Sequence, residues 1–147
     1  MTEVIVQARV VRQPGDGSCL FHSMCYGLGE VSAGHKELRE EIANVLEMEP
    51  ETLLSGTPIR DWVRWDSNMD PKAYASRMRT VGQWGGAIEI AVCAQLKGVS
   101  IHVYEPATEG RFRRISAFGT STSTKSAKTV SLLYGGQVHY DSLVYVV

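Results

Sequence analysis

Cys19 directly follows a glycine-rich turn, in the stretch PGDGSC. Thiolate is the reactive form of cysteine, and a helix N-terminus favours it because unpaired backbone N–H groups carry partial positive charge there. The apolar run from Cys19 to Leu28 predicts such a helix. The turn also lets the backbone around Gly17, Ser18 and Cys19 approach a substrate oxygen, as an oxyanion hole requires. The pattern therefore predicts a nucleophilic cysteine.

A nucleophilic cysteine needs a base, and His139 is the best candidate among the four histidines. His139 and Asp141 lie two residues apart on a predicted strand, so their side chains project from the same face. A carboxylate beside an imidazole fixes its tautomer and stabilises its cation. The other three histidines are expected to be solvated or packed within their own helix or strand. These residues predict a triad of Cys19, His139 and Asp141.

Each of these residues also has a less chemical interpretation. A cysteine in an apolar run is more often a core residue than a nucleophile, and a His-x-Asp pair is more often a surface pair. Cys25 and Cys93 fit the core interpretation, because each lies inside a predicted helix without a glycine-rich approach. Cys19, His22 and Cys25 do not suit a metal, since Cys25 lies about 240° round the helix from Cys19. We therefore expect no metal and no cofactor.

The amino-acid composition indicates which class of protein this chain belongs to. The chain has 147 residues, and its 44% hydrophobic and 21% charged content predicts one globular domain over residues 1–147. Three widely spaced cysteines make a poor disulfide framework, which favours a reducing, cytoplasmic compartment. No signal peptide and no apolar run near the roughly 20 residues of a membrane span are present. With a net charge of −1, we expect a monomer without nucleic-acid or membrane partners.

The elements that must position these residues are one strand, then several helices, then a run of strands. β-branched residues over 3–12 predict the first strand. Apolar spacing predicts helices over 35–48 and 87–97, and Pro71 suits the first turn of another. The remaining predictions are short helices around 51–55 and 59–65, strands over 99–105, 112–118, 129–135 and 138–147, and a loop over 119–129. This order predicts a sheet packed on helices, in an α+β or mixed α/β fold.

Three blocks of the sequence share a resemblance. PGDGSCLFHS contains Asp-Gly-x-Cys followed by Leu and Phe, and HYDSL, at residues 139–143, contains His-x-Asp. Between them, YASRMRTVGQWGG leads into WGGAIEIAVCAQLKGVSIHVYE, at residues 84–105. These blocks resemble the motifs of the ovarian-tumour (OTU) family of cysteine proteases. They follow the order of that family from about Gln13 to Leu143.

The resemblance implies a papain-like α/β fold, with a central, mostly antiparallel β-sheet sandwiched by helices. It also implies a deubiquitinase, which hydrolyses the isopeptide bond after the C-terminal Gly-Gly of ubiquitin or of a ubiquitin-like modifier. Cys19 then matches the nucleophile, His139 the base and Asp141 the third member of the triad. No cofactor is implied.

Four further residues take roles only through this resemblance. Asp16 matches the aspartate that shapes the cysteine loop and the oxyanion hole in the family. Trp84, Gly85 and Gly86 match the block beside the channel that admits the tail of the modifier. A Trp-Gly-Gly sequence before a helix is equally a packed N-terminal turn, so both interpretations stay open.

Other functions also stay open. The same chemistry suits an OTU-type protease that cleaves a viral polyprotein, and the fold suits a catalytically silent ubiquitin-binding module. Because the chain is short for the family, we expect that extra ubiquitin-binding elements are missing, or that this is a compact or viral form. Nucleic-acid binding is a further alternative to a solvated hairpin edge for a basic group made of Arg111, Arg113, Arg114, Lys125 and Lys128.

Overall fold

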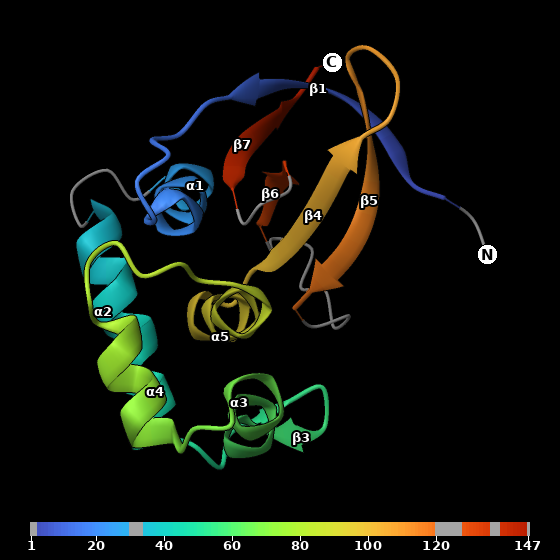
Figure 1. The fold of residues 1–147 in the computed structure, drawn as a ribbon. Helices are drawn as coiled ribbons and strands as arrows, with labels where there is room; N and C mark the ends of the chain where they lie inside the picture. Colours follow the sequence, from blue (N-terminus) through green and yellow to red (C-terminus); the bar gives the residue numbers. More distant parts are fainter. Residues whose placement is uncertain (1–2, 30–33, 120–127, 136–138, 147) are drawn as a thin grey trace.

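The structure, a computed structural model, describes residues 3–29, 34–119, 128–135 and 139–146. These residues form a mixed α/β fold (Figure 1). The strands are β1 (Ile5–Val11), β2 (Leu53–Leu54), β3 (Thr57–Pro58), β4 (Ser100–Pro106), β5 (Arg111–Phe118), β6 (Thr129–Tyr134) and β7 (Tyr140–Tyr145). The helices are α1 (Cys19–Leu28), α2 (Gly34–Met48), α3 (Ile59–Ser67), α4 (Pro71–Met78) and α5 (Ala87–Lys97).

Five strands form a sheet that closes on itself. Their order is β1-β5-β4-β6-β7, and β1 pairs with both β5 and β7. Every pair in this sheet is antiparallel except β4 with β6, which confirms the predicted, mostly antiparallel sheet. Because the second half of β1 pairs with β7, the chain leaving β1 at Val11 lies beside the strand that follows His139. The two halves of the predicted triad are thereby brought to one end of the sheet.

The two faces of the sheet bury different sets of side chains. The face toward the helices contributes to the larger core through Ile101, Val103, Val130 and Leu132. The opposite face encloses a second cluster of Ala8, Tyr104, Phe112, Leu133 and Leu143. Successive strand residues point to opposite faces, so one run of apolar residues can serve both clusters.

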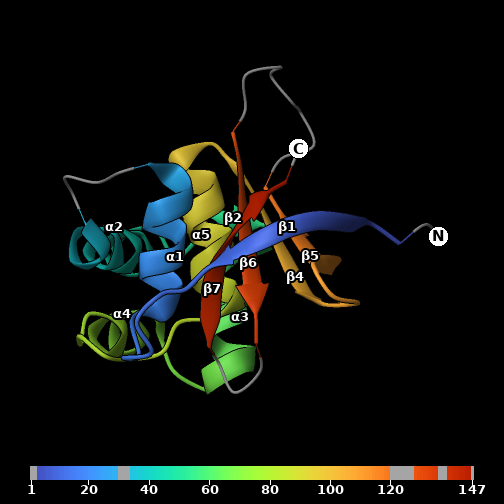
Figure 2. The ribbon, with the colours of Figure 1, turned by 90° about the horizontal axis from the view of Figure 1, so that it is seen from above.

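The helices gather on one side of the sheet (Figures 1 and 2). α1 contacts β6 and β7, and α5 contacts β4 and β5. The sequence prediction placed helices on both faces of the sheet, whereas the described helices lie on one face. The physical reason is that the closed strands cover the second apolar cluster themselves, so the described helices are needed on one face alone.

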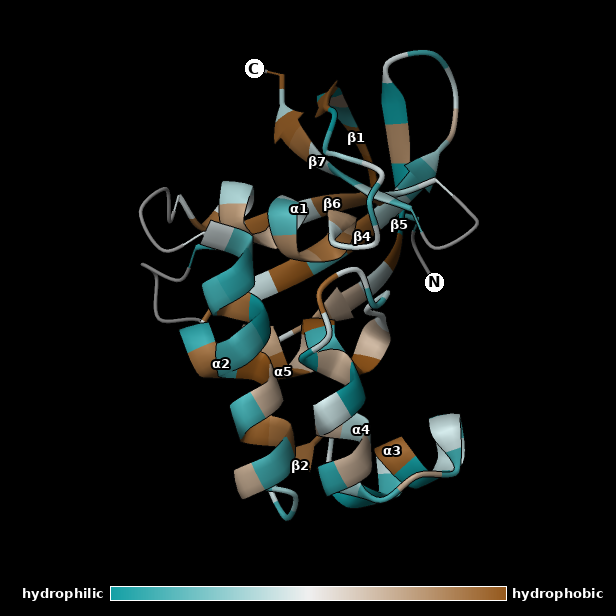
Figure 3. Cartoon of the chain, turned by 60° about the vertical axis from the view of Figure 1, so that its left-hand side comes forward, coloured by the Kyte–Doolittle hydropathy of each residue, from teal (hydrophilic) through white to brown (hydrophobic). Residues whose placement is uncertain are grey.

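The amphipathic pattern of α2 is visible in Figure 3, where hydrophilic and hydrophobic bands alternate along the ribbon. Its buried residues include Leu38, Ile42 and Leu46, as their helical spacing predicts. α1 and α5 both end at a glycine in the left-handed conformation, Gly29 and Gly98. The bounds predicted for these two helices are confirmed.

One predicted helix is wrong. The segment predicted as a short helix around 51–55 contains β2, which pairs with β3 in a two-residue hairpin. Ser55 and Gly56 both have positive φ, at 53° and 81°. Such angles suit a tight hairpin turn and end a right-handed helix. Most of the loop predicted over 119–129, and parts of the strand predicted over 138–147, lie outside the described residues.

None of the helices that the structure describes combines the length and the apolar character needed to cross a membrane.

Candidate active site

Cys19 is the first residue of α1 and is fully buried. The backbone N–H of Tyr140, on β7, donates a hydrogen bond to its Sγ over 3.3 Å. The two residues are 121 positions apart in the sequence. Packing of α1 on β7 therefore places the sulfur beside the strand that follows His139.

His139 and Asp141 form a side-chain pair at the start of β7. The Nε2 atom of His139 lies 3.0 Å from Oδ1 of Asp141, and the backbone N–H of Gln13 donates to the same oxygen over 2.8 Å. Asp141 is 6% exposed, whereas the His139 side chain is 33% exposed. A carboxylate only accepts hydrogen bonds, so this pairing puts a proton on Nε2 and leaves Nδ1 as the basic nitrogen.

The Nδ1 edge of His139 faces the loop that precedes Cys19. A Cβ atom built on Gly15 would lie 3.8 Å from Cε1 and 3.9 Å from Nδ1 of His139. The structure thus brings together all three predicted triad residues, with the basic nitrogen on the side of the cysteine loop.

The loop before Cys19 is shaped by Asp16. Its Oδ1 accepts a hydrogen bond from the backbone N–H of Ser18 over 3.0 Å, and this bond is the main reason why the pKa of Asp16 lies below its usual value. The bond also gives the Ser18 N–H a partner inside the protein. Ser18 is therefore not an available oxyanion donor in this structure, which corrects that part of the sequence prediction. The N–H groups of Gly17 and Cys19 stay predicted donors.

Gly17 is required by the geometry of this loop. Its φ is 83°, which lies in the left-handed region. A Cβ atom on Gly17 would overlap the carbonyl oxygen of Gly82. The cysteine loop and the segment before Trp84 consequently approach closely through the backbones of Gly17 and Gly82.

The Cys19 thiol is less acidic than its place at a helix N-terminus predicts. Burial raises its pKa, and this effect exceeds the lowering by backbone N–H groups of Tyr140 and Leu20. The nearby carboxylates of Asp141 and Asp16 raise the pKa further. A base is therefore needed to take the thiol proton, because the helix N-terminus alone does not produce the thiolate.

The Trp84–Gly86 segment is held by hydrogen bonds at the start of α5. The backbone N–H of Gly86 and the hydroxyl of Tyr74 each donate to Glu89 over 2.7 Å. Burial raises the pKa of Glu89 to about 7, despite these two bonds. Gly85 is buried, and a Cβ there would lie 3.0 Å from Leu20 of α1.

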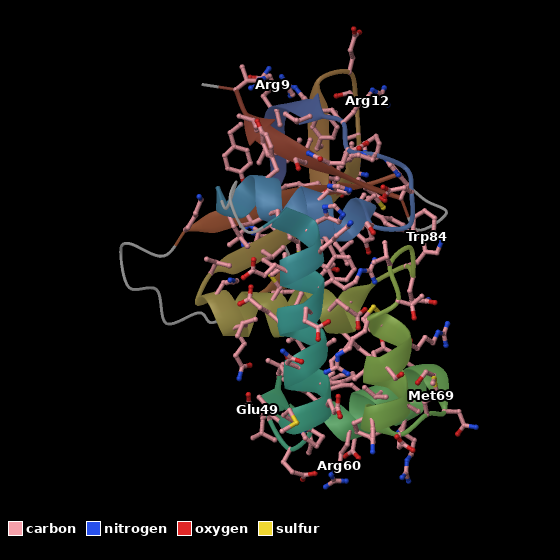
Figure 4. The ribbon with its side chains drawn as sticks, turned by 90° about the vertical axis from the view of Figure 1, so that its left-hand side faces the viewer. Arg9, Arg12, Glu49, Arg60, Met69 and Trp84 are labelled. Atoms are coloured by element: carbon pink, nitrogen blue, oxygen red, sulfur yellow. The ribbon has the colours of Figure 1, made fainter. Side chains whose placement is uncertain are left out.

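A pocket of about 710 Å³ opens beside this segment. Trp84, Gly85 and Gly86 line it together with residues of α3, α4 and α5. Trp84 is 39% exposed and projects at the edge of the molecule between the cysteine loop and α4 (Figure 4). The segment is thus both a packed helix start, at Gly85, and a surface beside a cavity, at Trp84.

The sequence around this site matches that of a known protein family. The sequence profile of the OTU-like cysteine proteases matches residues 14–142. The chain belongs to this family. The matched residues include the glycine-rich loop, Cys19, His139 and Asp141.

Two relatives show the range of proteins that carry an OTU sequence of this kind. The chain is 32% identical over 142 residues to ubiquitin thioesterase OTU1 of Danio rerio, covering 95% of the chain and 41% of that protein. It is 29% identical over 140 residues to the RNA-directed RNA polymerase L of Crimean-Congo hemorrhagic fever virus, covering 91% of the chain and 3% of that protein. The chain therefore spans less than half of either relative.

Solved OTU structures have the same fold. An OTU domain in complex with ubiquitin superimposes with a TM-score of 0.68 at 25% identity, covering 93% of this chain and 69% of that one. The Hazara virus OTU bound to ubiquitin gives a TM-score of 0.72 at 23% identity, covering 95% and 82%. The predicted family and mixed α/β fold class are confirmed.

Sequence reasoning missed several residues that support this OTU site. The side chain of Gln13 donates to Ser142 Oγ over 3.1 Å, and Ser142 donates to the Ser23 carbonyl over 3.2 Å, which joins β7 to α1. No sequence pattern marks Gln13 or Ser142. Arg39, by contrast, was detectable, because it precedes Ile42 by three residues and therefore lies on the apolar face of α2.

Of the other histidines, His22 lies beside Asp16 of the cysteine loop and His35 lies beside His22, whereas His102 is on β4. His22 lies 3.6 Å from Asp16 through Nε2, and its ring is 3.7 Å from that of His35. Burial and the neighbouring His22 lower the pKa of His35. Within the described residues, no three acidic, histidine or cysteine side chains are arranged to hold a metal ion.

Proposed function

We propose that this chain is a cytoplasmic, thiol-dependent deubiquitinase that acts as a monomer, with residues 1–147 forming one catalytic domain. In this proposal it hydrolyses the isopeptide bond after the C-terminal Gly-Gly of ubiquitin or of a ubiquitin-like modifier. The observation that carries the proposal is that neighbouring residues at the start of β7 contact both the histidine pair and the cysteine sulfur. His139 pairs with Asp141 over 3.0 Å, and the next residue, Tyr140, donates its N–H to the sulfur of Cys19 over 3.3 Å.

In the first half of the proposed reaction, Nδ1 of His139 takes the proton of the Cys19 thiol. The sulfur forms a bond to the carbonyl carbon of the last glycine, and the carbonyl oxygen becomes an oxyanion. Backbone N–H groups of Gly17 and Cys19 stabilise that charge. The oxyanion then collapses, the C–N bond breaks, and the lysine amine leaves with the proton from His139.

In the second half, water hydrolyses the thioester. Nδ1 of His139 takes a proton from the water as its oxygen bonds to the carbonyl carbon. Collapse of the second oxyanion breaks the C–S bond, and the sulfur recovers the proton as a thiol. Asp141 stabilises the imidazolium in both halves through its hydrogen bond to Nε2.

Two relatives support ubiquitin as the modifier. The OTU1 protein of Danio rerio is named a ubiquitin thioesterase, and the solved OTU domain at 25% identity is in complex with ubiquitin. A small, flexible Gly-Gly tail also suits a site whose cysteine is fully buried, because bulkier side chains are excluded by sterics.

The basic group is a weaker candidate for a second function. Arg113 lies 3.1 Å from the carboxylate of Glu105, and Lys128 donates to the carbonyl of Leu28 over 3.0 Å. Both cations are thus engaged within the protein, and we do not propose nucleic-acid binding.

The test uses ubiquitin that carries an electrophile at its C-terminus. The parent protein, Cys19→Ala and Cys25→Ala are each incubated with this probe, and intact mass is measured. Cys25 is the matched control, because it is a second buried cysteine on the same helix. We expect a covalent adduct in the parent and in Cys25→Ala but not in Cys19→Ala.

Turnover of a fluorogenic ubiquitin amide then distinguishes the alternatives. A silent binding module gives no turnover, and Cys19→Ala binds ubiquitin as tightly as the parent does. A polyprotein protease cleaves a peptide after a small residue pair but leaves ubiquitin amide intact. Either result, in protein with native circular dichroism, would reject the deubiquitinase proposal.

A further inference from the structure

Arg39, on α2, is among the largest fully buried side chains and is 2% exposed. A buried cation normally pairs with a carboxylate, because its removal from water is costly. Its hydrogen bonds to described residues instead reach Met78 O at 2.8 Å, Ser18 Oγ at 3.1 Å and Gly17 O at 3.4 Å, with a longer contact to the Met78 sulfur. The guanidinium also lies 4.2 Å above the ring of Phe21. A residue needed only to fill this space would not have to be charged.

These contacts hold one peptide unit at both edges. The Gly17 carbonyl and the Ser18 N–H belong to the same planar peptide group. Arg39 donates to that carbonyl, and Asp16 accepts from that N–H over 3.0 Å. With both edges held, the orientation of the peptide is fixed. The N–H groups on either side of it, those of Gly17 and Cys19, are the oxyanion donors of the proposed mechanism.

The same guanidinium also reaches the second loop of the site. Met78 is the last residue of α4, and the chain then leads through 79–83 to Trp84. Burial lowers the pKa of Arg39, and the negative charges of Glu89 and Asp16 oppose that shift. One carboxylate belongs to the start of α5 and the other to the cysteine loop. Arg39 is therefore a junction between the two loops that flank the nucleophile.

We propose that Arg39 is a positioning residue for the hydrolase reaction, fixing the Gly17–Ser18 peptide so that the neighbouring N–H groups meet the oxyanion. This inference rests on the proposed thiol-dependent function. It predicts that loss of the guanidinium slows acyl transfer, while reactivity of the sulfur itself is kept.

The test compares two reactions of Cys19 in the parent, Arg39→Met and Arg39→Lys. Alkylation by iodoacetamide forms a C–S bond and expels iodide, without creating an oxyanion. Acylation by p-nitrophenyl acetate transfers the acetyl group to the sulfur through a tetrahedral oxyanion and releases nitrophenolate. Both rates are measured on Cys19 by peptide mass, together with kcat and KM for a fluorogenic ubiquitin amide. Arg60→Met is the matched control, because Arg60, on α3, pairs with Glu51 over 2.6 Å and lies outside both loops of the site.

For Arg39→Met we expect acylation and kcat to fall at least about tenfold, as for loss of part of an oxyanion hole. Alkylation and KM should stay within about twofold of the parent. Arg39→Lys should lie between the parent and Arg39→Met, and Arg60→Met should match the parent. Equal losses of alkylation and acylation, or no loss in either, would overturn the inference.

The outcomes separate this inference from the proposed function. If the parent is acylated by the ester but does not process ubiquitin, the deubiquitinase proposal fails, and Arg39 is still judged by the ratio of the two rates. If Arg39→Met does not fold by circular dichroism, Arg39→Lys provides the same ratio.

Discussion

The nucleophile side of this site, around Cys19, is held by packing, whereas the histidine side, around His139, is held by a hydrogen bond. Cys19 is fully buried at the start of α1, where helices and glycine backbone pack around it. His139 is 33% exposed at the edge of β7, and its described side-chain hydrogen bond is the one to Asp141. Cys19, on the nucleophile side, is thus part of the core, whereas the side chain of His139, on the histidine side, is partly exposed at the start of β7.

Because of this difference, substitutions on the two sides should affect different properties, the free energy of unfolding on one side and turnover on the other. A change on the nucleophile side disturbs packing and should lower the free energy of unfolding. A change on the histidine side removes a hydrogen bond near solvent and should lower turnover while the fold is kept. Substitutions on the two sides therefore test whether the division is real.

The largest effect is expected for His139→Ala. Without the base, kcat/KM for a fluorogenic ubiquitin amide should fall about 10³-fold or more, since general acid–base catalysis typically contributes 10²–10⁴-fold. Thermal unfolding should stay within about 4 °C of the parent, because the loss of one partly buried hydrogen bond costs about 1 kcal/mol of the free energy of unfolding. His102→Ala, on β4, is the control and should retain activity. A large drop in stability for His139→Ala would contradict the division.

Gly17→Ala should act on the other side, mainly through stability. The left-handed φ of 83° and the overlap with Gly82 should together cost about 3 kcal/mol in urea unfolding. Gly56→Ala isolates the first effect, because its φ is 81° and no atom lies within 4 Å of the added Cβ. We expect about 1 kcal/mol there. Equal losses for the two variants would show that the contact between the loops is unimportant.

Asp141 should show a graded loss of turnover. Asp141→Asn keeps an oxygen that accepts from the Gln13 N–H, and a Cys-His-Asn arrangement supports papain-like catalysis. We expect less than about a tenfold loss of kcat for Asn and about a 100-fold loss for Ala. If steady-state kinetics give the same kcat for both variants, Asp141 does not act through its hydrogen bonds.

Glu89, on the nucleophile side, should make stability depend on pH. Its pKa is raised to about 7 in the folded protein, so the fold binds its proton more tightly than the unfolded chain does. Its contribution to stability is fully present below about pH 4.3, the pKa of an unperturbed glutamate. It declines as pH rises through about 7. Glu89→Gln should remove this decline.

Thermal unfolding at pH 5 and pH 8 measures the effect. The difference in Tm between these two values should be smaller in Glu89→Gln than in the parent. Glu109→Gln, at an exposed position, is the control and should keep the parental difference. An unchanged difference in Glu89→Gln would show that this carboxyl does not govern the pH response.

The sequence by itself determined the local elements and the chemical parts of the site. Helix α1 was predicted from an apolar run that ends in glycine, and Cys19 from the turn before it. His139 and Asp141 were predicted to share a face because strand residues two apart do so, and they lie 3.0 Å apart. The turn at Ser55 and Gly56 escaped prediction, because one positive φ falls on a serine, which rarely adopts it.

Only the tertiary structure decided how these parts meet. Pairing of β1 with both β5 and β7 closed the sheet, and no local pattern encodes which strands become neighbours. Packing of α1 on β7 set the Tyr140 N–H on the Cys19 sulfur and buried the sulfur deeply enough to raise its pKa. Packing of α2 brought Arg39 to the carbonyl of Gly17, whereas the bond from the Ser18 N–H to Asp16 is local and spans two residues. Residue types fix which bonds are possible, whereas long-range packing fixes which of the competing donors and acceptors come within reach.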